Sequence, residues 1–73
     1  MSETTKEKKG IIEDWFEITS VHGDKVVVDN LGVKTTVQIV GKASREMIGG
    51  NALIKYCGLL EGKLIFPKFV RYE

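Results

Sequence analysis

Apolar and polar residues alternate most regularly over residues 33–40, VKTTVQIV. An alternation with a period of two is typical of a β-strand that has one buried and one exposed face. Lys34 and Gln38 fall on the face that we expect to be exposed. The side chains predicted to point inwards are Val33, Thr35, Val37 and Ile39.

Four other stretches have the composition of β-strands: residues 11–21, 25–28, 51–60 and 63–72. Glycine-containing turns are predicted between strands at residues 22–24, 29–32 and 61–62. Pro67 lacks a backbone donor, so it must lie at a sheet edge, at a bulge or on an unpaired side. The first stretch also fits a helix, and the β-rich remainder favours a strand. The residues that share the helical spacing are Ile11, Ile12, Trp15, Phe16 and Thr19.

Residues 41–50 interrupt the strand pattern. Ser44 can cap a short helix of one or two turns, of α or 3₁₀ geometry, which ends before Gly49 and Gly50. Three strands, a helical link and two strands follow one another in an OB-fold. We therefore expect an all-β fold, a small five-stranded OB-like barrel with a short helix between strands three and four. An SH3-like barrel is the alternative, with its 3₁₀ turn between strands four and five.

The 73 residues allow one small domain. Residues 1–10 are almost entirely polar, so we expect a disordered leader there and a single domain at residues 11–73. The sequence has no run of about 20 apolar residues that could span a bilayer, and no signal-peptide pattern. Cys57, the single cysteine, is expected to be buried in a strand. These features predict a cytoplasmic protein without a membrane partner.

The net charge of +1 conceals an uneven distribution along the chain. Residues 1–30 hold four basic and seven acidic side chains, a net charge of −3, whereas residues 31–73 hold seven basic and three acidic ones, a net charge of +4. A division of this kind indicates a polarised surface. A well-solvated barrel with mixed charges explains it too, since halves of a sequence need not be halves of a structure.

Side chains with catalytic or metal-binding chemistry are few in the sequence. His22, the single histidine, falls in a predicted turn, where a solvated imidazole is the usual state. Glu13, Asp14 and Glu17 are close together, but a strand turns Asp14 away from the other two. The sequence has no glycine-rich phosphate-binding loop. We therefore expect no enzymatic activity, no metal and no cofactor.

The last predicted strand interleaves aromatic and basic residues. Cationic side chains neutralise phosphates, and aromatic rings stack on bases, so the pattern favours nucleic-acid binding. The same pattern fits a strand in which Phe66 and Val70 belong to the core and the cations protect a sheet edge. Trp15 is expected in the core. The candidate nucleic-acid-binding residues are Lys42, Lys55, Lys63, Lys68, Phe69 and Arg71.

The C-terminal sequence LIFPKFVRYE, preceded by NALIKYCGLLEGK, resembles the end of the OB-fold domain of ATP-dependent polynucleotide ligases. In that family a strand ending in Lys-Tyr leads through an acid-glycine turn into the sequence Arg-Phe-Pro-Arg-Phe-x-Arg. The counterparts here are residues 54–56, 61–63 and 66–71. Residues 37–48 are also similar to the strand, glycine and short helix of the family, so the likeness covers roughly residues 31–73.

The resemblance implies an OB barrel that lies against a DNA backbone with Lys55, Lys63, Lys68 and Arg71. It does not extend to catalysis, because the adenylation domain of the family, with its Lys-x-Asp-Gly nucleophile, has no counterpart in these 73 residues. In addition, Ile65 stands where the family usually has its first arginine. We therefore expect a non-catalytic, ligase-like module that binds single- or double-stranded DNA.

A second function from a different class is also open. Exposed Phe69 and Val70 could contact an apolar patch on a larger protein partner, which would make the domain a protein-interaction or assembly module without nucleic-acid binding. The sequence does not predict the oligomeric state.

Overall fold

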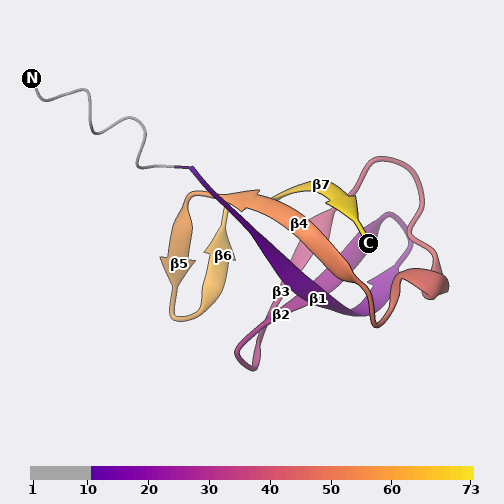
Figure 1. The fold of residues 1–73 in the computed structure, drawn as a ribbon, viewed down its shortest axis with the longest axis horizontal. Coiled ribbons are helices and arrows are strands. Elements are labelled where there is room, and N and C mark those ends of the chain that lie inside the picture. Colours follow the sequence, from indigo (N-terminus) through magenta and orange to yellow (C-terminus); the bar gives the residue numbers. More distant parts are fainter. Residues whose placement is uncertain (1–10) are drawn as a thin grey trace, which may run out of the picture.

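The computed structural model describes residues 11–73, and this part of the chain is all-β (Figure 1). The expected disordered leader at residues 1–10 lies outside the described residues. No helix in residues 11–73 is long and apolar enough to cross a membrane. The elements in chain order are β1 (Ile12–His22), β2 (Lys25–Asn30), β3 (Val33–Gln38), the 3₁₀ turn η1 (Arg45–Met47), β4 (Asn51–Tyr56), β5 (Gly58–Leu60), β6 (Lys63–Ile65) and β7 (Lys68–Tyr72).

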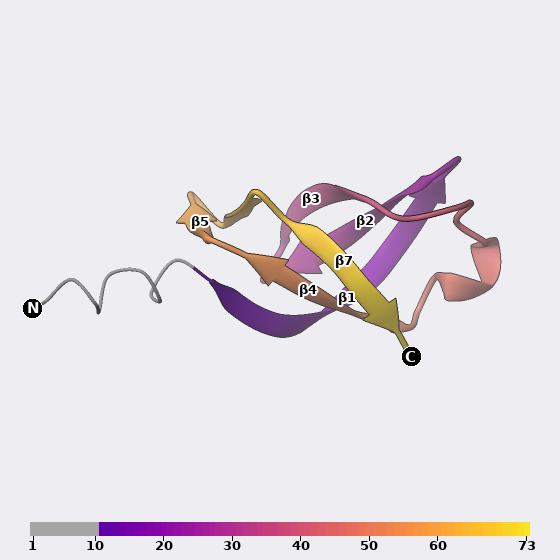
Figure 2. The same ribbon diagram turned by 90° about the horizontal axis from the view of Figure 1, so that it is seen from above.

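Five antiparallel strands form the main sheet in the order β3-β2-β1-β4-β7, and β5 pairs with β6 in a separate hairpin. The long strand β1 pairs with β4 along its first half and with β2 along its second half. The partners change at Glu17, which lies opposite both Asn51 and Asp29. A register shift between Ile18 and Ser20 marks a β-bulge, and bulges bend the strand that carries them. The sheet is accordingly curved (Figure 2).

The main sheet remains open and does not close into the OB-like barrel, closed or nearly closed, that the sequence predicts. No ladder of backbone hydrogen bonds joins the edge strands β3 and β7 within residues 11–73. Strand β6 lies against β3 instead, where the backbone N–H of Leu64 donates to Thr35 Oγ1 at 3.1 Å. Because the Leu64 side chain is buried, the β5–β6 hairpin covers part of the gap between the two edges.

Alternation along the strands produces a single hydrophobic core. The prediction for residues 33–40 is confirmed, since Thr35, Val37 and Ile39 are buried and Lys34 and Gln38 are exposed. The strand interpretation of residues 11–21 is also confirmed over the helical one. The buried hydrophobic side chains are Phe16, Ile18, Val26, Val28, Val37, Ile39, Met47, Ala52, Ile54, Tyr56 and Leu64.

The short helix expected between strands three and four is not formed; the three-residue 3₁₀ turn η1 stands there. Ser44 caps it as expected, with Ser44 Oγ accepting from the backbone N–H of Glu46 at 3.3 Å. The segment then leaves the turn because Gly49, at φ 94°, donates to the carbonyl of Ile18. This contact with β1 at once after η1 leaves no room for a longer helix.

Two of the expected strands are each broken in two. Residues 51–60 divide at Cys57, and residues 63–72 divide at Phe66 and Pro67. Cys57 is exposed, so the expectation of a buried thiol was wrong. Pro67 falls in the break between β6 and β7, where no ladder hydrogen bond is required of it.

Candidate nucleic-acid interface

Lys55 and Lys68 are direct cross-strand partners in the ladder between β4 and β7. Both side chains are exposed, and they lie on the outer face because Ile54 and Tyr56 beside Lys55 are buried. Like charges directly opposite each other destabilise a sheet. Neither lysine forms an ion pair with an acidic side chain within residues 11–73. The pair therefore places two positive charges side by side; Glu13, the partner of Lys55 in the ladder between β1 and β4, lies on the other side of Lys55 without forming an ion pair with it.

An open hollow of about 650 Å³ adjoins this lysine pair. Both lysines contribute to its wall, and within the described part of the chain the wall contains no acidic side chain. Its composition suits a ligand that combines negative charge with a flat apolar group. The residues lining the hollow are Ile11, Lys55, Tyr56, Cys57, Phe66, Lys68, Phe69 and Val70.

The two phenylalanines at the hollow differ in burial. Phe69 lies opposite Ile54 and packs against the core, so only part of its ring reaches the hollow. Phe66 is 81% exposed and is therefore not the core residue that one interpretation of the strand required. Val70 is the extra residue of a bulge in β7, since Phe69 and Arg71 pair with consecutive residues of β4. The exposed aromatic ring of the site is that of Phe66, which the candidate list did not include.

Arg71 lies on the same outer face, opposite Leu53, and is separated from Lys68 by Phe69 and the bulge residue Val70. Its guanidinium carbon is 5.5 Å from the centre of the Trp15 ring, a cation–π arrangement across the intervening strand β4. Its Nε also approaches Glu73 Oε2 at 4.0 Å. Trp15 is 39% exposed, so the expectation that it belongs to the core was wrong.

Lys42 and Lys63 lie apart from the hollow. Lys63 belongs to the β5–β6 hairpin, opposite Leu60. Lys42 lies in the segment before η1, next to Ala43, whose N–H donates to the carbonyl of Gly23 in the β1–β2 turn. The hairpin and η1 are at opposite ends of the long axis in two perpendicular views (Figures 1 and 2). The structure thus brings together Lys55, Lys68 and Phe69, with Arg71 nearby, and separates Lys42 and Lys63 from them.

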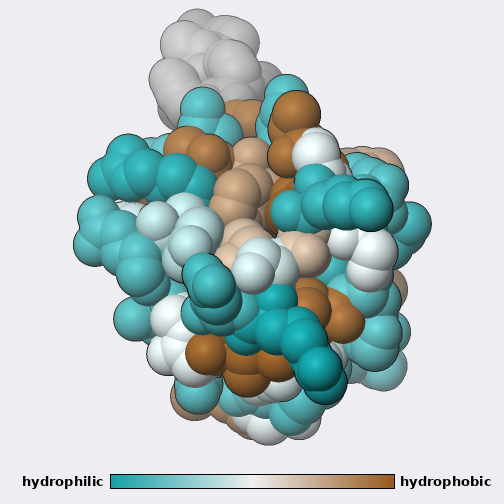
Figure 3. Space-filling view, turned by 90° about the vertical axis from the view of Figure 1, so that its right-hand side faces the viewer, coloured by the Kyte–Doolittle hydropathy of each residue, from teal (hydrophilic) through white to brown (hydrophobic). Residues whose placement is uncertain are grey.

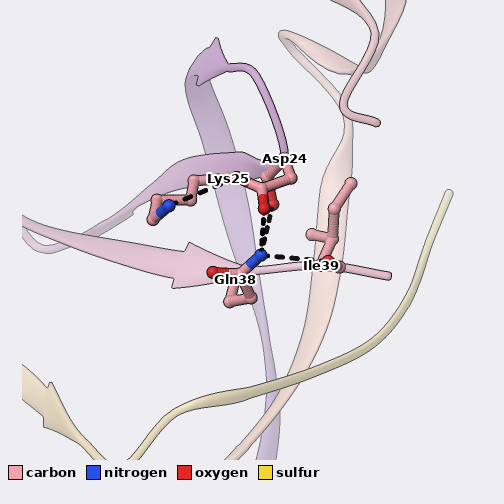
Figure 4. A network of polar contacts seen from close by, with 4 residues as sticks. All are labelled: Asp24, Lys25, Gln38 and Ile39. Carbon is pink, nitrogen blue, oxygen red and sulfur yellow. Dashed lines mark hydrogen bonds and ion pairs between the residues drawn. The ribbon is translucent and has the colours of Figure 1, made fainter. Parts of the chain in front are cut away.

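Lys25 and Lys34 are compensated locally, whereas Lys42 and Lys63, like Lys55 and Lys68, form no ion pair within residues 11–73. Lys25 contacts Asp24 at 3.2 Å, and Lys34 contacts Asp29 at 3.0 Å. Hydrogen bonds from the Gln38 amide and then from Lys25 hold the pKa of Asp24 below its usual value (Figure 4). The pKa of Asp29 is lowered in the same way, most strongly by the hydrogen bond from Lys34 and less by the one from the N–H of Gly32.

The end of the molecule that carries η1 has a surface of mixed hydropathy (Figure 3). Hydrophobic side chains form small separate patches between hydrophilic ones on that side (Figure 3). His22 ends β1 with an exposed side chain whose Nε2 lies 3.4 Å from Ser20 Oγ. No group of three or more potential metal-ligating side chains occurs within the residues that the structure describes.

Comparison of the chain with known protein families, characterised proteins and solved structures gave no match. The resemblance to polynucleotide ligases therefore stays a prediction from the sequence.

Proposed function

We propose that this protein is an OB-like module that binds DNA without catalysing a reaction on it. An OB-fold is a five-stranded, partly open barrel. The curved five-stranded sheet, with β6 covering the gap between its edge strands, supports that assignment. The resemblance of residues 31–73 to the OB domain of ligases supports it independently.

The observation that carries the proposal is the cross-strand pair of Lys55 and Lys68, neither of which forms an ion pair within residues 11–73, beside aromatic side chains. Two adjacent ammonium groups can neutralise phosphates of a nucleic-acid backbone, and their mutual repulsion is relieved when phosphates bind. Phe66 and Phe69 provide the flat apolar surface that a base or sugar contacts. Affinity then depends strongly on salt, with little reading of sequence.

A salt titration with matched charge variants tests this proposal. Fluorescence anisotropy of labelled single-stranded and duplex DNA is measured on the full chain, on K55A/K68A and on K42A/K63A. Each double variant removes two charges, but only the first removes them at the hollow. The slope of log affinity against log salt should flatten by roughly 1.4 for single strands in K55A/K68A, because each phosphate contact contributes about 0.7. An equal loss of DNA affinity and of salt dependence in both double variants would refute a binding site at the hollow.

The exposed apolar side chains near the β5–β6 hairpin favour a second function, contact with a protein partner. Ile11, Leu59, Leu60 and Phe66 are all exposed, and Val70 is partly so. Phe69 is unsuited to the contact first expected of it, because it packs against the core. An interface of this kind would resist high salt, whereas DNA binding would not. Light scattering and pull-down at high salt separate the two functions.

A further inference from the structure

Phe66 has an unusual backbone conformation for an aromatic residue. Its φ angle is 50°, in the left-handed region that bulky L-residues rarely adopt. It also precedes Pro67, and residues before proline favour an extended conformation. Strain of this kind persists where the surrounding structure enforces it, and it gathers at functional sites.

The two other non-glycine residues with positive φ in residues 11–73 have an ordinary explanation. Leu31 and Glu61 each occupy the first position of a two-residue hairpin turn and are followed by glycine. Such turns require positive φ at both central positions. Phe66 is at no hairpin turn; it lies where the chain passes from β6 to β7. Glycine would pass this corner with less strain, so the corner itself does not account for a phenylalanine.

Burial does not account for Phe66 either. With 81% of its surface exposed, the ring contributes little to the core. What the conformation achieves is to place the ring on the wall of the hollow that also holds Lys55 and Lys68. Its backbone strain, its exposure and its position beside two lysines are three separate observations on the Phe66 side chain.

From these observations we infer that Phe66 is a stacking platform for an unpaired base, and that the hollow takes single-stranded rather than duplex nucleic acid. This inference rests on the proposed DNA-binding function. A base stacked inside a duplex has no free face, whereas a single strand offers a base to the Phe66 ring and its phosphates to Lys55 and Lys68. An aromatic ring accepts every base, so the preference is for exposed bases and not for a particular sequence.

The experiment compares three labelled probes of equal length at low salt: a poly-dT strand, the same strand with abasic sites, and a duplex. Fluorescence anisotropy is measured with the full chain, F66L, F66W and L31A. F66L keeps an apolar side chain without a flat ring, and F66W keeps the ring. L31A changes another exposed residue with positive φ, away from the hollow.

We expect the full chain to bind the dT strand more tightly than either other probe. F66L should weaken binding of the dT strand by roughly 5- to 150-fold, the contribution of one stacked base, and leave the abasic strand unaffected. F66W and L31A should bind the dT strand like the full chain.

Equal affinity of the full chain for dT and abasic strands would overturn the inference, as would an equal loss for both strands in F66L. Those results leave DNA binding itself intact. Absence of salt-dependent binding to all three probes would instead end the proposed function and the inference together. Circular dichroism spectra of F66L and the full chain are compared to establish that F66L is folded, so that a loss of affinity does not reflect unfolding.

Discussion

The side-chain amide of Asn30 donates a 2.9 Å hydrogen bond to the carbonyl oxygen of Gly62, 32 residues further along the chain. This bond joins the end of β2 to the turn between β5 and β6. Together with the bond from Leu64 to Thr35, it anchors the hairpin over the gap between the sheet edges. The anchored hairpin determines where the chain re-enters the sheet, and so where Phe66 lies.

Gly62 should be much less tolerant of alanine than Gly32. Both glycines have φ near +90°, so both substitutions introduce backbone strain. Only at Gly62 would an added Cβ collide with a neighbour, since it would come within 2.6 Å of Val33 Cγ2. We expect G32A to lose about 1 kcal/mol of unfolding free energy and G62A about 1–3 kcal/mol more. Urea denaturation measures both, and equal losses would show that the close approach to Val33 is unimportant.

Replacing Thr35 by valine should destabilise the protein through an unpaired backbone donor. Thr35 is buried, and its hydroxyl accepts the backbone N–H of Leu64. The T35V variant keeps the shape of the side chain but leaves that N–H unsatisfied, which costs about 1–3 kcal/mol. T36V, on the exposed face of the same strand, is the matched control. Hydrogen exchange should also accelerate at Leu64 in T35V alone; unchanged exchange there would contradict the anchoring role.

The strand pattern could be predicted from the sequence where the chain alternates. Residues 33–40 have one buried and one exposed face because the period of two is imposed by the backbone itself. The same rule places Trp15 on the outer face, since its neighbour Phe16 points inwards. Its size and hydrophobicity favoured the core, and the period of two was the better guide.

The breaks at Cys57 and Phe66 could not be predicted in the same way. Residues 52–60 form a nearly continuous apolar run, and only the contact of the hairpin with Asn30 and Thr35 separates β5 from β4. The adjacency of Lys55 and Lys68 depends on the register of β4 and β7, which includes a bulge at Val70. Register and bulges are tertiary properties, so the sequence could not show which of the candidate lysines lie side by side.

Acid should weaken the fold through Asp24 and Asp29. The folded-state pKa of each is lowered, so the unfolded chain binds protons more readily than the folded one. Their contribution to stability is complete above the ordinary aspartate pKa of 3.8 and is lost as the pH falls from there through the lowered pKa values of the folded state. Thermal unfolding between about pH 5 and pH 2 should therefore show a fall that D24N/D29N reduces. E46Q and E61Q together control for net charge, and an unaltered acid profile in D24N/D29N would contradict the assignment.

Phe66 should be dispensable for stability. Glycine adopts positive φ without strain, which offsets the greater entropy that it gives the unfolded chain. The exposed ring loses few contacts on removal. We expect F66G to have an unfolding free energy that is unchanged or raised by up to about 1 kcal/mol. A loss above 2 kcal/mol in urea denaturation would show that the ring is structural, whereas F16A, in the core, should lose about 3–5 kcal/mol.

Reversing one charge of the lysine pair should stabilise the fold and impair binding at the same time. In K68E a carboxylate faces Lys55 across the ladder, so repulsion becomes attraction and the unfolding free energy rises by about 0.2–1 kcal/mol at low salt. The same change removes a charge-assisted phosphate contact, which lowers DNA affinity by about tenfold or more. K63E is the control, because Lys63 faces Leu60 and gains no cross-strand partner.

An opposition between stability and binding in K68E would identify Lys55 and Lys68 as a functional pair. Lysines that serve solubility alone would serve equally well at scattered positions, although Glu13, opposite Lys55 on β1, offsets part of the repulsion between Lys55 and Lys68. Thermal unfolding and fluorescence anisotropy are measured at low and at high salt. The rise in stability and the loss of DNA affinity in K68E should both become smaller at high salt, because the charges are screened. The inferred binding site would be contradicted if K68E were less stable than the parent chain, because Lys55 and Lys68 would then not repel each other measurably. It would also be contradicted if K68E bound DNA as tightly as the parent chain.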